Sequence, residues 1–147
     1  DGTPNRPVVH IKDVCSAYLA GLNAPAKLVA GRSFNVGIPN GNFTVRQLAE
    51  AAQRSVPGSE LTFTGEHGSD ARTYKVGFKR ILTELAAYYK PEWDLDCGGK
   101  ELVDMFRRFS FTEEDFRGKK TTRLAQLSYL QKQNVIDSNM RFSTLLS

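Results

Sequence analysis

The stretch Arg6-Pro7-Val8-Val9-His10-Ile11-Lys12-Asp13-Val14 decides the fold class of this 147-residue chain. Pro7–Ile11 is rich in β-branched residues and predicts a buried strand, because the run is too short for a helix. Asp13 is then a candidate N-cap residue. Apolar residues follow it at helical spacing, at Val14, Ala17, Tyr18, Gly21 and Leu22. The stretch therefore predicts a strand that leads directly into a helix.

The same alternation of strand and helix continues along the chain. Ser33–Gly37 and Leu61–Thr64 predict two further short strands. Thr44 is a candidate cap for a helix that extends to Val56. We also expect helices at 78–85, 102–106 and 121–134, and a turn at Cys97–Gly99. Short strands alternating with helices indicate an α/β domain with largely parallel pairing, but the strands are too few for a complete doubly wound sheet.

The composition is that of a soluble globular domain with a sizeable core, at 40% hydrophobic and 24% charged residues. No apolar run is long enough to span a membrane, and no signal-like stretch lies near the start. We therefore expect a cytoplasmic chain with no membrane partner. Cys15 and Cys97 lie far apart in the sequence and form neither a disulfide framework nor a zinc knuckle, which fits a reducing compartment.

The net charge of +4 gives little support to a nucleic-acid partner. Basic residues gather toward the C-terminal end, at Arg107, Arg108, Arg117, Lys119, Lys120 and Arg123. Glu113, Glu114 and Asp115 interrupt this group, and stacking aromatics do not alternate with it. We therefore expect a solvated face and no nucleic-acid partner.

Familiar catalytic and cofactor motifs are missing from the sequence. Residues 65–71 have the spacing G-x-x-G-x-x-A, but residues 72–76 predict an extended segment rather than the helix that would hold a pyrophosphate, so a substrate-facing loop is favoured. His10 and His67 lie far apart without a ligand cluster, so no metal site is expected. His10 itself is predicted to be a hydrogen-bonded structural histidine.

Two arginines stand at positions where α/β proteins place ligand contacts. Arg6 precedes the first predicted strand, and Arg72 follows Asp70 in the loop after the third. A guanidinium in such a place can bind two phosphate oxygens at once. The alternative for each is a surface arginine, or one paired with a carboxylate such as that of Asp70.

Four segments of the chain resemble the extended short-chain dehydrogenase/reductase family that acts on nucleotide sugars. Residues 6–14 with Ala17 resemble its R-x-F/V-V-H-V-x-D-V-x-x-A segment, and residues 34–37 its F/Y-N-V-G strand. Residues 42–50 resemble N-x-T-V-x-E-L-A-E, and residues 70–76 resemble D-x-R-x-Y-x-V. The four occur in the family's order and cover roughly residues 1–109. The chain departs from the pattern at Pro7, where the family often has an aromatic or acidic residue.

The resemblance implies the C-terminal, substrate-binding portion of a Rossmann-type enzyme, with residues 1–109 as that portion and 110–147 as an extension with one helix. The enzyme would be an NAD(P)-dependent nucleotide-sugar epimerase, 4,6-dehydratase or ketoreductase. Its partners would be a nucleoside diphosphate sugar and an N-terminal Rossmann half, since the chain starts at Asp1 as though it enters a fold midway. A homodimer of the full-length protein is a further candidate assembly.

The resemblance also assigns site residues. The arginines that match Arg6 and Arg72 contact the diphosphate in that family. Asn35 and Tyr74 would give supporting contacts, with packing at a strand end as the alternative for each, and Asp70 would orient Arg72.

Catalysis in that family needs a glycine-rich NAD(P) turn and a Y-x-x-x-K pair, and neither occurs in this sequence. We therefore expect no catalytic residue, no cofactor-binding residue and no hydride transfer from this chain alone, with NAD or NADP bound mainly by the absent half. The alternative is a stand-alone, non-catalytic module that binds a phosphorylated ligand.

Overall fold

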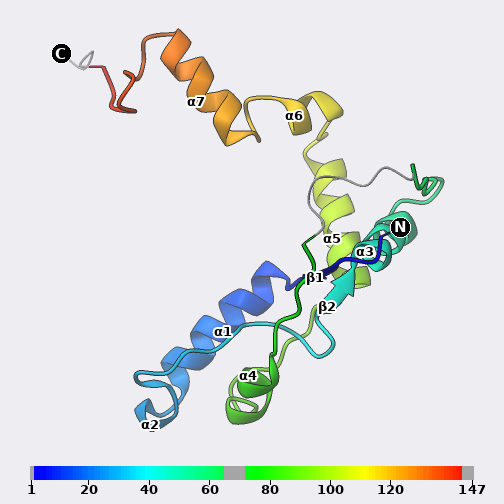
Figure 1. Ribbon diagram of the computed structural model, residues 1–147, viewed down its shortest axis with the longest axis vertical. Coiled ribbons are helices and arrows are strands. Elements are labelled where there is room, and N and C mark those ends of the chain that lie inside the picture. The colour runs from blue at the N-terminus through cyan, green and yellow to red at the C-terminus, as the bar shows by residue number, and fades with distance from the viewer. Residues whose placement is uncertain (1, 65–71, 144–147) are drawn as a thin grey trace. The chain divides into compact units, whose positions relative to one another are not determined.

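The computed structural model describes residues 2–64 and 72–143, which form seven helices and one two-stranded antiparallel sheet (Figure 1). The chain divides into two compact units, Asp1–Val103 and Asp104–Ser147, which are described separately. The elements are β1 (Asn5–Pro7), α1 (Ile11–Asn23), α2 (Ala26–Val29), β2 (Asn42–Thr44), α3 (Val45–Ser55), α4 (Lys79–Glu84), α5 (Leu95–Arg108), α6 (Glu113–Arg117) and α7 (Arg123–Lys132). The described part is thus mostly helical, and the predicted α/β character is only weakly present.

The predicted strand at Pro7–Ile11 is wrong, because a helix begins inside it. β1 ends at Pro7 and pairs antiparallel with β2, with Arg6 opposite Phe43. His10 caps α1, and its Nδ1 accepts a hydrogen bond from the Lys12 backbone N–H at 3.2 Å. The cap therefore lies three residues before Asp13, which was expected to provide it.

The predicted strands at Ser33–Gly37 and Leu61–Thr64 are also not formed: both segments are described, and neither carries a strand. Figure 1 shows the chain between α2 and β2 running back along α1. A strand requires a neighbour to pair with. The apolar alternation at Phe34 and Val36 fits a strand, but the described residues provide no ladder for it.

The core of the first unit lies between α1 and α4. Its buried residues are Ala17, Ala20, Ala24, Ile81, Leu85 and Tyr89. The α1 members recur at spacings of three and four residues, which places them on one face of the helix. Helix α4, expected at 78–85, supplies Ile81, and Leu85 follows as its C-cap residue.

Asp13 points into this core and is only 2% exposed. Its carboxylate accepts hydrogen bonds from the backbone N–H groups of Glu92 (3.0 Å) and Trp93 (3.1 Å). Nearby, the Tyr89 hydroxyl donates to the Gly37 carbonyl oxygen at 3.1 Å. Burial and the charge of Asp13 raise the pKa of Tyr89 to about 12. These contacts attach the segment between α4 and α5 to α1 and to residue 37.

Helix α3 confirms the prediction that Thr44 begins it. The Thr44 hydroxyl accepts from the Gln47 N–H at 3.1 Å, and the Gln47 side chain accepts from the Thr44 N–H at 2.8 Å. This reciprocal pair is a capping box, which satisfies two backbone donors at the helix start.

The predicted turn at Cys97–Gly99 is wrong, because these residues lie in α5. Asp94 precedes the helix and accepts from the Cys97 N–H at 2.8 Å, a bond that lowers the pKa of Asp94. Gly99 is required by packing rather than by a turn. A Cβ at Gly99 would overlap the Ser55 hydroxyl and lie 3.1 Å from the Ser55 Cβ.

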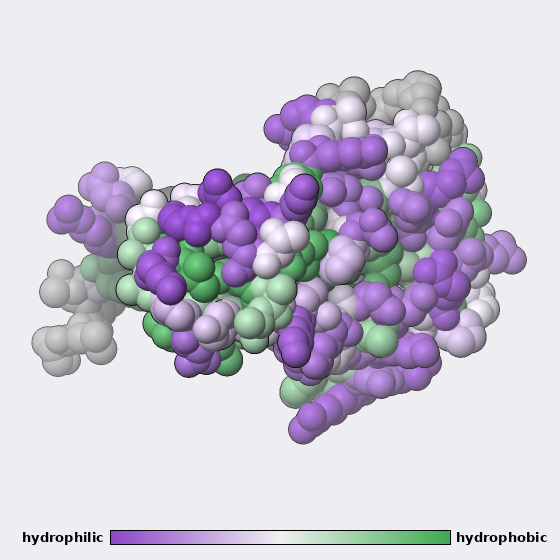
Figure 2. Space-filling model, turned by 90° about the horizontal axis from the view of Figure 1, so that it is seen from below, coloured by the Kyte–Doolittle hydropathy of each residue, from purple (hydrophilic) through white to green (hydrophobic). Residues whose placement is uncertain are grey.

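The second unit contains the end of α5, then α6 and α7. Helix α7 confirms the helix expected at 121–134, whereas α6 is an additional one that begins with a capping box between Thr112 and Asp115. Phe106 and Phe111 stack at 4.8 Å between ring centroids. Large apolar side chains are exposed in both units, and Figure 2 shows hydrophobic residues reaching the surface among hydrophilic ones. Within the described ranges, no helix is long and apolar enough to cross a membrane.

Candidate functional site

Arg6 and Arg72 lie side by side although 66 positions separate them in the sequence. Arg6 is the central residue of β1, where its pairing with Phe43 of β2 fixes the backbone. Its Nη1 donates to the carbonyl oxygen of Asn5 at 2.9 Å and to the carbonyl oxygen of Arg72. The structure thus brings together the two arginines that were singled out for a diphosphate.

Tyr74 belongs to the same cluster. The Arg6 guanidinium lies 5.7 Å from the centroid of the Tyr74 ring, within the range of a cation–π contact. The tyrosine is 53% exposed, so its ring is accessible from solvent. We call Arg6, Arg72 and Tyr74 together the arginine site.

Of the two other predicted site residues, the structure describes Asn35 but not Asp70. The Asn35 amide donates to the carbonyl oxygen of Gly77 at 3.2 Å, which is a packing contact with the segment that follows the arginine site. A role for Asn35 in substrate binding stays a prediction. Asp70 lies outside the described residues, as does the predicted pairing of its carboxylate with Arg72.

Two residues that sequence reasoning missed hold the segment that carries Arg72 and Tyr74. The Thr73 hydroxyl accepts from the backbone N–H of Asn5 at 2.9 Å. The Asn42 side chain makes two hydrogen bonds with the backbone of Val76, at 2.8 and 2.9 Å. The only sequence signal for Asn42 is that it opens the N-x-T-V motif.

The chemistry of the arginine site favours an oxyanion. Each guanidinium is always charged and presents five N–H donors in a planar fork, which matches phosphate oxygens. The Arg6 guanidinium contacts the backbone of Arg72, so the two residues lie close together in the structure. A diphosphate carries oxygens on both phosphorus atoms and could be bound by both arginines.

His10 has a structural role, as predicted, although it lies at a helix cap and not in a strand. Its ring stacks on Trp93 at 4.1 Å, and its Nε2 lies 2.7 Å from the Glu101 carboxylate. Because Nδ1 accepts a hydrogen bond from the Lys12 N–H, the ring hydrogen lies on Nε2. Nε2 then donates a hydrogen bond to the Glu101 carboxylate. Hydrogen bonding from the Lys12 ammonium, with a further contribution from His10, lowers the pKa of Glu101.

Two features of the described residues bear on a dinucleotide cofactor and on a metal. Residues 72–78 form neither helix nor strand and the next helix begins at Lys79, so no helix N-terminus directly follows residues 65–71 to hold a pyrophosphate. Across residues 2–64 and 72–143, no group of three or more metal-ligating side chains occurs. His67 lies outside these ranges.

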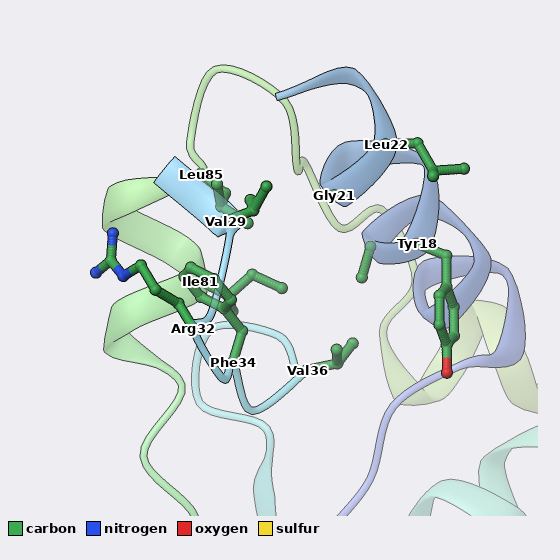
Figure 3. A pocket seen from close by; sticks show the side chains of 10 residues that line it. Tyr18, Gly21, Leu22, Val29, Arg32, Phe34, Val36, Ile81 and Leu85 are labelled. Atoms are coloured by element: carbon green, nitrogen blue, oxygen red, sulfur yellow. The ribbon is translucent and has the colours of Figure 1, made fainter. Parts of the chain in front are cut away.

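A separate apolar pocket of about 430 Å³ opens beside α1 (Figure 3). Tyr18 and Leu22 of α1 lie on one side, Ile81 and Phe34 on the other, and Val36 between them. Tyr18 is 74% exposed and Leu22 is 81% exposed. The pocket therefore has an apolar rim that the described residues leave exposed.

Neither a scan against protein-family models nor a search of the solved structures finds a match for this chain. The resemblance to nucleotide-sugar enzymes therefore rests on its four sequence segments.

Proposed function

We propose that this chain is the C-terminal, nucleotide-sugar-binding portion of an NAD(P)-dependent epimerase or dehydratase of the extended short-chain dehydrogenase/reductase type. The observation that carries the proposal is the contact between Arg6 and Arg72. Two segments chosen from the sequence for the same ligand, and distant along the chain, lie against each other at the two-stranded sheet.

In this proposal the two arginines bind the diphosphate and Tyr74 lines the same site. Bidentate contacts fix the diphosphate in one orientation, so that the sugar is presented to the reacting groups in a defined geometry. Those groups, and the NAD(P) that supplies hydride transfer when bound, belong to the Rossmann half. This chain contributes binding and orientation only.

The uncovered apolar surface supports a Rossmann half as the partner. Phe34 and Val36 carry the alternation of a strand but lie outside any ladder of the described residues, beside the pocket rim of Tyr18 and Leu22. An apolar patch of this kind marks an interaction surface in a soluble protein. A partner that adds a strand at residues 34–36 would satisfy the backbone and cover the rim together.

Titration calorimetry with UDP, dTDP, GDP and CDP tests the proposal. We expect the chain to bind at least one of them, and Arg72→Ala to weaken that binding by about 1.5–3 kcal/mol, the value for a hydrogen bond to a charged group. Arg107→Ala is the matched control, because Arg107 is exposed on α5 and pairs with Asp104 at 3.8 Å. No binding by the unmodified chain would refute the proposal, and equal losses in both variants would remove Arg72 from the site.

A further inference from the structure

Asn42 pairs with both backbone groups of one residue on a distant segment. Its Oδ1 accepts from the Val76 N–H at 2.8 Å, and its Nδ2 donates to the Val76 carbonyl oxygen at 2.9 Å. A neighbouring strand would satisfy the same N–H and C=O groups in a ladder. A carboxamide can do so because it carries a donor and an acceptor side by side, which a carboxylate or a hydroxyl does not reproduce.

Residues 72–75 of the segment held in this way have little else to order them, whereas beyond Val76 the Asn35 amide bonds Gly77 and Phe78 is buried. Residues 72–78 form no helix or strand, and the side chains from Arg72 to Lys75 are exposed. Few apolar contacts therefore oppose local opening of this part of the chain. Its position depends on polar contacts to the sheet.

Two such contacts lie on either side of Tyr74 in the sequence. Thr73 is bonded to the backbone of Asn5 in β1, and Val76 is bonded to Asn42 in β2. Since β1 and β2 pair with each other, both contacts attach the segment to the sheet that carries Arg6. The distance between Arg6 and the Tyr74 ring is thereby set from both ends of a four-residue span.

We propose that Asn42 is a positioning residue of the arginine site, whose carboxamide holds Tyr74 and Arg72 in place beside Arg6 without touching the ligand. This inference rests on the proposed function. If the segment is already ordered, ligand binding does not have to supply the free energy for ordering it. Loss of the Asn42 contacts should therefore appear as weaker binding.

The test measures the binding of UDP and of inorganic pyrophosphate to the unmodified chain and to Asn42→Ala and Asn42→Asp. Asn42→Ala loses both hydrogen bonds and should weaken binding about 5- to 30-fold, the range expected from two ordinary hydrogen bonds. Asn42→Asp keeps the acceptor for the Val76 N–H, but it turns a carboxylate oxygen toward the Val76 carbonyl oxygen and adds a negative charge near an oxyanion site, so its loss of binding should be at least as large. Asn23→Asp, at the exposed end of α1, is the control for the added charge and should bind like the unmodified chain.

A double-mutant cycle separates positioning from a general structural role. In an Arg72→Ala background, Asn42→Ala should cost much less than it does alone, because the group that it positions is gone. The amide hydrogen of Val76 should exchange faster in Asn42→Ala than in Asn42→Asp. Additive losses, or full binding by Asn42→Ala, would overturn the positioning role and leave the proposed function standing. Absence of binding by the unmodified chain would refute both.

Discussion

Replacement of Gly37 by alanine should destabilise the first unit, because there is no space for a methyl group at this position. A Cβ on Gly37 would overlap the Phe78 ring and lie 2.6 Å from its Cγ. Carbon atoms pack at about 3.5–4.0 Å, so the ring has to move by about 1 Å. Phe78 is buried and caps α4, so its movement disturbs the helix that supplies Ile81 to the core. Overpacking of this kind costs about 1–3 kcal/mol.

Urea unfolding followed by circular dichroism measures the effect. The midpoint concentration should fall without a change in slope, and each kcal/mol should lower the melting temperature by about 2–4 °C for a chain of this size. Gly21→Ala is the matched control: Gly21 lies in α1, and a Cβ there has no neighbour within 4 Å. It should stabilise the helix by about 0.5–1 kcal/mol. If Gly37→Ala is as stable as the unmodified chain or as Gly21→Ala, the steric reasoning is wrong.

Three further predictions concern the buried polar groups and catalysis. Asp13→Ala leaves two backbone N–H groups without their acceptor and should cost about 2–4 kcal/mol of unfolding free energy, whereas the exposed Asp104→Ala should change it little. The pKa of Tyr89 is raised to about 12, so the folded state holds this proton more tightly than the unfolded state; stability should fall between about pH 10 and pH 12, and Tyr89→Phe should fall less steeply over that range. The chain incubated with NAD(P) and nucleotide sugars should give no new sugar nucleotide by chromatography, the readout needed because an epimerase or dehydratase returns its cofactor to the starting oxidation state; conversion that copurifies with the chain would contradict the proposal that catalysis belongs to the other half.

Local signals in the sequence predicted the helices better than the strands. Thr44 and the residues after it carry the whole signal for the start of α3 within four positions, and the structure has the expected capping box. A strand depends on a distant partner, and residues 33–37 have none among the described residues, so the strand that the pattern predicts is not formed there. Cys97–Gly99 was assigned to a turn because glycine favours turns, whereas Gly99 makes room for Ser55 on another helix.

The arginine site was predicted in part. Arg6 and Arg72 stand at the ends of predicted strands, where a ligand contact and a surface arginine were both open; the Arg6 side chain does contact the Arg72 backbone, and ligand binding stays a prediction. Asn42 and Thr73 could not be found in the same way, because their hydrogen bonds join residues 34 and 68 positions apart. Hydrophobic periodicity reports which face of an element is buried, and it carries no information about which polar side chain reaches a remote backbone.

The site and the core are therefore stabilised by different interactions, and this has a consequence for variants. The core depends on packing around Ile81, Leu85 and Tyr89, so changes there should lower the melting temperature. The segment that carries Arg72 depends on hydrogen bonds from exposed or half-buried side chains, each of which adds little to the global free energy of unfolding. Substitutions at Asn42 should thus reduce ligand binding more than they reduce stability, whereas Gly37→Ala should do the reverse. The opposite ranking would mean that the segment after residue 72 is ordered by the core and not by its contacts with the sheet.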